Sequence, residues 1–140
     1  MAYLLAALGG ALGALARWGL ASALPSSPGG WPWATLLVNL TGCLLIGVLL
    51  AVLLARFPAS PWMRPLLATG VLGGFTTYST FAMDAVALVD AGRPGVAVGY
   101  VVATVLGGVL AVAGGLRLGR AAVRTRGSVD AGLAVETGRS

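Results

Sequence analysis

The length and continuity of its apolar runs constrain this chain most strongly. Four such runs occupy Tyr3–Leu24, Trp33–Ala55, Trp62–Val89 and Val96–Leu118. A helix needs about 20 mostly apolar residues to cross the hydrocarbon core of a bilayer. Only 9% of the 140 residues are charged, whereas ordinary soluble domains carry about 25%. We therefore predict an all-α membrane protein with four transmembrane helices.

The segments between the runs mark where these helices end. Pro25–Gly30 is rich in proline and glycine and cannot continue a helix, and Pro58 follows closely on the second run. From Ala121 onward the residues become small, polar and charged. We expect residues 1–120 to form one transmembrane domain and residues 121–140 to form a polar, disordered tail.

Charge and residue usage narrow the function. The chain has a formal net charge of +5, and four arginines lie at or just after the end of the last apolar run: Arg117, Arg120, Arg124 and Arg126. This position is typical of a cytoplasmic flank on anionic lipid, so we expect no nucleic-acid partner. Cys43 is the only cysteine and histidine is absent. No disulfide framework, metal-ligand spacing or common general base is therefore available, and we expect no enzyme.

The arginines are distributed unevenly about the predicted membrane. With four spans, both termini and the loop after the second run lie on one side. That side carries Arg56, Arg64, Arg117, Arg120, Arg124, Arg126 and Arg139, whereas the other side carries only Arg93. This asymmetry predicts a single orientation in the membrane and a differently oriented partner. Alternatively, the tail arginines are synthesised too late to steer insertion.

Glycines four residues apart recur inside the runs, at Gly9/Gly13, Gly70/Gly74, Gly95/Gly99 and Gly115/Gly119. This spacing lets helix backbones approach closely in lipid, although a chain with 22 glycines also produces such pairs by chance. We expect tight helix packing within or between subunits. Four helices leave little room at their centre, so we expect an ion route at an oligomer interface.

The third run contains the most informative polar stretch, Thr69–Phe81. It holds three glycines followed by four Ser or Thr residues at membrane depth. We expect Gly73–Gly74 to weaken the helix and the following threonines to satisfy the freed backbone groups. A break there would expose carbonyl groups able to bind a cation. The alternative is a packing kink whose hydroxyls bond back to their own helix.

Three further polar residues lie inside apolar runs. The amide of Asn39 could donate to an anion, or it could make a hydrogen bond between helices. Arg17 lies near the end of the first run, where contact with an ion and snorkelling to the interface are both open. Asp84 follows Phe81 by one helical turn, and we expect it to cap a polar network or to lie in a vestibule.

Three motifs resemble those of the bacterial fluoride channel family (Fluc/CrcB). They are Gly9-Gly10-x-x-Gly13-Ala14-x-x-Arg17-Trp18, then Thr35-Leu36-x-Val38-Asn39-x-x-Gly42, then Gly73-Gly74-Phe75-Thr76-Thr77-Tyr78-Ser79-Thr80-Phe81. They occur in the family's order on three of the four predicted helices. The resemblance implies an antiparallel dimer with two fluoride pathways and a structural sodium ion at its centre. By motif position, Gly73 and Thr76 supply oxygens to the sodium ion.

The same resemblance assigns the fluoride pathway. It implies that Asn39 lines the path, that Ser79 and Thr80 lie on a polar track, and that Phe81 turns a ring edge toward the ion. Tyr78 stands where the family usually has phenylalanine. Its ring keeps the positive edge and adds a hydroxyl group, which could bind fluoride or obstruct the path. Arg17 completes the set of residues that we assign to the pathway.

The resemblance implies passive export of fluoride across the inner (cytoplasmic) membrane, which lowers the toxicity of intracellular fluoride. Two alternatives remain. One is a small proton-coupled exporter, which needs an intramembrane carboxylate that the first run lacks. The other is a non-conducting partner subunit of a heterodimeric channel. Homodimer and heterodimer are both open at this point.

Overall fold

The computed structural model describes residues 1–24, 30–57 and 60–137, with side chains through residue 125. All regular structure in these residues is helical. The elements are α1 (Ala2–Ala23), α2 (Trp33–Arg56), η1 (Arg64–Leu72, a π-helix), α3 (Gly73–Phe75), α4 (Tyr78–Asp90) and α5 (Pro94–Thr137). The predicted loop at Pro25–Gly30 falls almost entirely outside the described residues.

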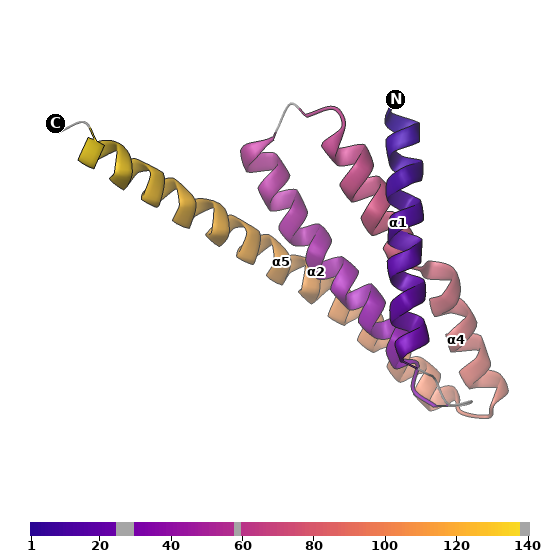
Figure 1. The fold of residues 1–140 in the computed structure, drawn as a ribbon. Coiled ribbons are helices and arrows are strands. Elements are labelled where there is room, and N and C mark those ends of the chain that lie inside the picture. The colour runs from indigo at the N-terminus through magenta and orange to yellow at the C-terminus, as the bar shows by residue number, and fades with distance from the viewer. Residues whose placement is uncertain (25–29, 58–59, 138–140) are drawn as a thin grey trace.

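The chain passes up and down through an elongated bundle (Figure 1). The N-terminus, the end of α2, the start of η1 and the end of α5 lie at one end, and the α4–α5 turn lies at the other. Among the residues that the structure describes, three helices are long and apolar enough to cross a membrane: α1, α2 and residues Pro94–Thr125 of α5. The third predicted span is divided among η1, α3 and α4. The chain is therefore a multi-pass membrane protein, with three single-helix candidates for its spans.

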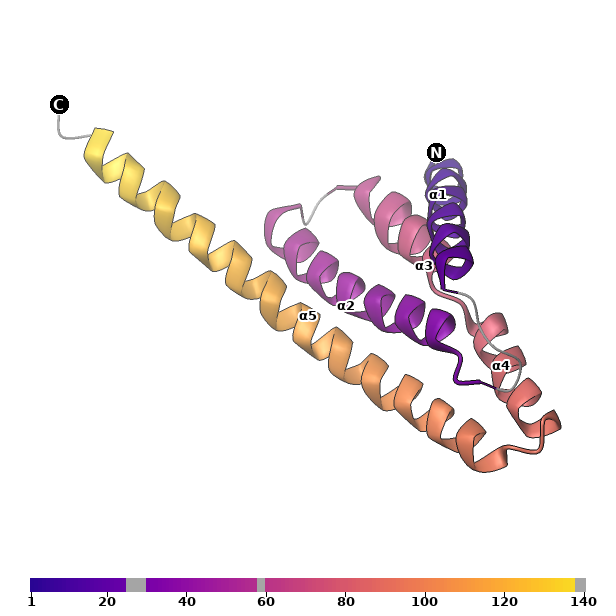
Figure 2. The same cartoon turned by 60° about the horizontal axis from the view of Figure 1, so that its bottom comes forward.

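Glycines bring α5 against α2, its main neighbour (Figure 2). A Cβ atom added to Gly115 would overlap the carbonyl oxygen of Leu44, and one added to Gly47 would overlap that of Val112. Gly119 lies in the same way against Val48. The two parallel backbones are therefore in direct contact, as the predicted Gly115/Gly119 pair requires.

A second glycine contact joins α1 to the first part of the third segment. Gly9 and Gly13 face the backbones of Leu66 and Val71. From the other side, a Cβ atom on Gly74 would overlap the carbonyl oxygen of Gly10, and Gly70 meets α1 similarly. This contact fixes η1 and α3 against α1. The predicted Gly95/Gly99 pair makes no backbone contact of this kind, because Gly95 has open space around it and Gly99 meets only the ring of Trp31.

The best-buried apolar cluster lies where α2, α4 and α5 meet. It contains Leu36, Leu88, Ala97 and Tyr100, all less than 9% exposed. Gly92 makes the sharp α4–α5 turn with a positive φ of 72°, a conformation that glycine adopts without steric cost. Elsewhere, large apolar side chains remain exposed on the outer faces of the helices, as expected where lipid is the solvent.

The last helix differs from the expectation. The sequence predicts its end near Leu118, but α5 continues to Thr137. No proline follows Pro94, and alanine, arginine and valine after Leu118 allow the helix to continue. The division of the chain at residue 120 stays a prediction.

The glycine contact between α1 and the third segment yields a test. A Cβ atom at Gly13 would overlap the carbonyl oxygen of Val71 and lie 2.8 Å from the nitrogen of Phe75. Gly13→Ala should therefore lower the free energy of unfolding in mixed micelles by about 1–3 kcal/mol. Gly19→Ala, in the same helix with open space around it, should leave it unchanged or raise it by up to about 1 kcal/mol. Equal effects of the two changes would contradict this helix contact.

Candidate functional site

Two extended residues interrupt the third segment. Thr76 has φ −75° and ψ 154°, and Thr77 has φ −143° and ψ 122°. The expected break at Gly73–Gly74 is wrong in position, because both glycines are helical in α3. Gly74 is needed for the close approach to Gly10, so its role is packing and the helix ends only after it.

Asn39 of α2 bridges the interruption. Its Nδ2 donates to the carbonyl oxygen of Thr77 at 3.0 Å, and its Oδ1 accepts from the Thr77 N–H at 2.9 Å. The N–H and the C=O of Thr77 are thereby both paired, as buried backbone groups need to be. Of the two alternatives for Asn39, the structure contains the hydrogen bond between helices. Nδ2 carries a second N–H, which has no acceptor among the described residues and remains for a ligand.

The hydroxyl of Thr77 starts the next helix. It accepts from the N–H of Thr80 at 3.2 Å as the N-cap of α4, donates to the Thr80 hydroxyl at 3.1 Å and lies 3.3 Å from that of Ser79. The Thr76 hydroxyl donates back to the carbonyl oxygen of Leu72 at 3.0 Å. The two threonines therefore have different roles. The hydroxyl of Thr76 bonds back to its own helix, and the hydroxyl of Thr77 caps the N-terminus of α4.

An open groove of about 830 Å³ runs beside the interruption, between α2, α4 and α5. Its walls are mostly apolar. The lining residues with a polar amide or hydroxyl group are Asn39, Thr76, Thr77, Tyr78 and Thr104, and Gly73 also borders the groove. The structure thus brings together both predicted sodium ligands, Gly73 and Thr76, with three of the predicted pathway residues, Asn39, Tyr78 and Phe81.

Aromatic rings form a chain that leads from this groove into the contact between α4 and α5. The rings of Tyr78 and Phe81 are 5.9 Å apart, which confirms that they stack on one face of α4. Phe81 in turn lies 5.4 Å from the ring of Tyr100 in α5. Tyr78 is 81% exposed, and its hydroxyl has no hydrogen-bond partner among the described residues. In the subunit, this hydroxyl is therefore free to meet whatever enters the groove.

Two residues of α5 belong to this site although the sequence did not single them out. The Tyr100 hydroxyl donates to Oδ2 of Asp84 over a long 3.5 Å, and the Thr104 hydroxyl donates to the carbonyl oxygen of Tyr100 at 2.8 Å. Tyr100 is fully buried, whereas Thr104 lines the groove. Two polar residues four apart in an apolar run share a helix face, and this spacing was the available signal. Of the two alternatives for Asp84, the structure contains the polar contact, which is this hydrogen bond from Tyr100.

Arg17 lies in a separate cavity of about 230 Å³ between α1, α2 and α4. The cavity also contains Trp18 and the hydroxyl-bearing residues Thr35, Thr77 and Thr80. The Nε of Arg17 is buried and has no hydrogen-bond partner in the part of the chain that the structure describes. Thr80 therefore lies with Arg17, while Ser79 is exposed beside Thr77. A cationic group and hydroxyl donors in one cavity form a site suited to an anion.

The sequence profile of the family described as CrcB-like protein, Camphor Resistance (CrcB), matches residues 4–116. The chain belongs to the CrcB family. Curated members include "Fluoride-specific ion channel FluC 2" of Streptomyces avermitilis, which is 50% identical over 70% of this chain and 62% of its own length. "Fluoride-specific ion channel FluC 2" of Thermobifida fusca is 50% identical over 76% of this chain and 78% of its own length. "Fluoride-specific ion channel FluC" of Rhizobium meliloti is 46% identical over 86% of this chain and 97% of its own length.

The CrcB region therefore covers the interruption, the groove and the cavity at Arg17, and it ends one residue before Arg117. The chain spans less than two thirds of the Streptomyces relative but nearly all of the Rhizobium relative. The groove and its polar residues thus belong to the part of the chain that is common to the family.

The bridge at Asn39 yields a prediction about stability. Asn39→Ala removes the partner of both the N–H and the C=O of Thr77. The free energy of unfolding in mixed micelles should fall by about 1–3 kcal/mol for each of these groups that stays buried. The matched control is Thr41→Ala, an exposed site on the same helix, which should change it by less than about 0.5 kcal/mol. A stable Asn39→Ala protein would show that the interruption does not depend on this amide.

Proposed function

We propose that this CrcB protein is a fluoride-selective channel that lets fluoride leave the cell passively across the inner (cytoplasmic) membrane. The observation that carries the proposal is the interruption at Thr76–Thr77, which places polar groups and aromatic edges along one groove. The names of its relatives support fluoride as the ion. The protein acts on no covalent bond and is not an enzyme.

The chemistry of the lining fits an anion that holds its water tightly. Such an ion needs donors and positive edges that replace its hydration within a narrow path. The second N–H of Asn39 and the ring edges of Tyr78 and Phe81 are of this kind. We assign the pathway to these three together with Ser79 and Thr80. Arg17, in its own cavity beside Thr80, attracts the anion toward this path.

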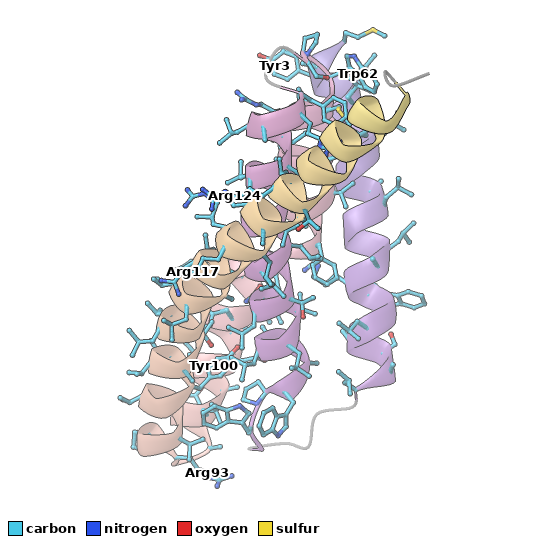
Figure 3. The ribbon with its side chains drawn as sticks, turned by 90° about the vertical axis from the view of Figure 1, so that its left-hand side faces the viewer. Tyr3, Trp62, Arg93, Tyr100, Arg117 and Arg124 are labelled. Carbon is cyan, nitrogen blue, oxygen red and sulfur yellow. The ribbon has the colours of Figure 1, made fainter. Side chains whose placement is uncertain are left out.

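The subunit alone does not enclose the path, because the groove is open. A second subunit packed in the antiparallel sense would cover its apolar walls and form a pathway on each side. Arg56 ends α2 and Arg64 begins η1, two residues after Trp62. Figure 3 shows Trp62 at the same end of the bundle as Tyr3, whereas Arg93 lies at the other end. This distribution supports a single orientation of the chain. We therefore favour a heterodimer with an oppositely oriented homologue over a homodimer.

A sodium ion at the centre of this dimer would be held by Gly73 and Thr76. The residues fit a hard cation that prefers oxygen ligands. The N–H of Thr77, which would close a helical turn on the carbonyl oxygen of Gly73, donates to Asn39 instead. Both residues line the groove, and the extended conformation of Thr76 frees its carbonyl group from the helix. Bound sodium would supply positive charge that joins the two subunits.

Fluoride efflux from liposomes tests the proposed function. The protein reconstituted in sodium, alone or with a paired homologue, should release fluoride but retain chloride. Phe81→Ala should lower the rate, because it removes a ring edge from the path. A large organic cation in place of sodium should abolish efflux, because the dimer would lose its central ion. No fluoride efflux in any combination would reject the channel and favour a non-conducting subunit. Efflux that requires a proton gradient would favour the exporter.

Tyr78 yields the sharpest test of the pathway. If its free hydroxyl points into the closed path, it binds the passing ion and slows its departure, since conduction needs sites that release the ion readily. Tyr78→Phe should then raise the fluoride turnover per folded dimer and leave the selectivity over chloride unchanged. An equal or lower rate would place the hydroxyl outside the path. In that case it would bond to a neighbouring helix of the dimer, and the substitution would lower stability by about 0.5–1.5 kcal/mol.

A further inference from the structure

One face of α5 changes from apolar to basic along its length. Leu106 and Leu110 are 60% and 71% exposed. Arg117 and Arg124 follow on the same face, because they stand seven and fourteen residues beyond Leu110, and Arg120 lies within one turn of both. All three arginines are exposed. Figure 3 shows Arg117 and Arg124 projecting from the same side of the helix.

The position of the change along α5 matches the thickness of a bilayer. At 1.5 Å per residue, Arg117 lies about 34 Å along the helix from Pro94, and the hydrocarbon core is about 30 Å thick. Leu106 and Leu110 therefore lie at the depth of the acyl chains, and the arginines begin where the phosphates of the far leaflet are expected. Long arginine side chains at this depth extend outward to the headgroups.

The three arginines have no acidic partner in the sequence around them. No aspartate or glutamate occurs between Asp90 and Asp130, and neither Arg117, Arg120 nor Arg124 makes an ion pair with any residue that the structure describes. The match to the CrcB family model ends at residue 116, one residue before the first of these arginines. The positive charge of this face is thus left for a ligand outside the subunit.

We propose that this face, defined by Leu106, Leu110, Arg117, Arg120 and Arg124, binds anionic phospholipid in the leaflet at the end of the bundle that holds the N-terminus and the end of α5. The leucines contact an acyl chain, and the arginines bind the headgroup phosphate with charge-assisted hydrogen bonds. Leu106 and Leu110 do not line the groove beside the interruption, so a lipid here leaves the proposed dimer contact uncovered. Bound lipid holds α5 at a fixed depth in the membrane.

The test compares lipid selection by the full chain in phosphatidylcholine bilayers that contain spin-labelled phosphatidylglycerol or spin-labelled phosphatidylcholine. The wild-type protein should select phosphatidylglycerol. The triple variant Arg117→Gln, Arg120→Gln, Arg124→Gln should lose this preference by at least about fivefold, which is the factor that one basic side chain supplies near an anionic surface. The preference of the wild type should also shrink in 1 M salt, where the Debye length falls to about 3 Å. An unchanged preference in the triple variant would overturn the proposal.

Two further measurements distinguish binding of lipid by charge from a change in helix packing and from binding of a soluble anion. The variant Arg117→Lys, Arg120→Lys, Arg124→Lys keeps the charge, so it should keep most of the preference; a loss as large as that of the glutamine variant would refute binding by charge. Inorganic phosphate should displace the labelled lipid no more than sodium chloride of equal ionic strength does. Specific displacement by inorganic phosphate would assign the arginines to a soluble anion and not to lipid. Neither measurement depends on fluoride transport.

Discussion

The pair of hydrogen bonds between Asn39 and Thr77 is the interaction on which the site depends. A break in the middle of a membrane segment leaves backbone N–H and C=O groups without helical partners, and lipid supplies neither donor nor acceptor. A side-chain amide carries a donor and an acceptor in the geometry of a peptide unit, so one residue of α2 satisfies both the N–H and the C=O of Thr77. Alanine, leucine or aspartate at this position could not do so. The interruption is therefore stable because α2 passes beside it.

The glycine contacts decide where that interruption lies. α3 is held against α1 by Gly74 and Gly10, and α5 is held against α2 by Gly47 and Gly115. Between these two close contacts, the third segment must pass from α1 to α5, and it does so at Thr76–Thr77. The groove opens at this passage, which explains why the polar groups of three elements meet there.

The sequence predicted the parts of this arrangement that depend on local composition. The apolar runs predicted the three long helices, and the spacing of Tyr78 and Phe81 predicted their stacking. The predicted position of the break was wrong because Gly74 stays helical. Its low helix propensity is outweighed by its contact with Gly10, more than sixty residues away in the chain. The bonding of Asn39 was left open for the same reason, since its partner lies 38 residues later. The role of Tyr100 also depends on tertiary contacts. The assignments of sodium, of the dimer and of the fluoride path come from family resemblance, and they stay predictions.

The pairing of helices also sets the order in which the chain can assemble in the membrane. α1 packs mainly on η1 and α3, and α2 packs mainly on α5, whereas the successive helices α1 and α2 touch little. The first two helices therefore cannot form a stable hairpin as they leave the ribosome. α2 can pack against its main neighbour only after α5, the last helix of the chain, has been synthesised. Until then the face of α2 that contains Gly47 stays exposed to lipid. A chain that stops before Gly115 would leave α2 without its main neighbour, and the interruption at Thr77 would depend on a helix that is itself unsupported.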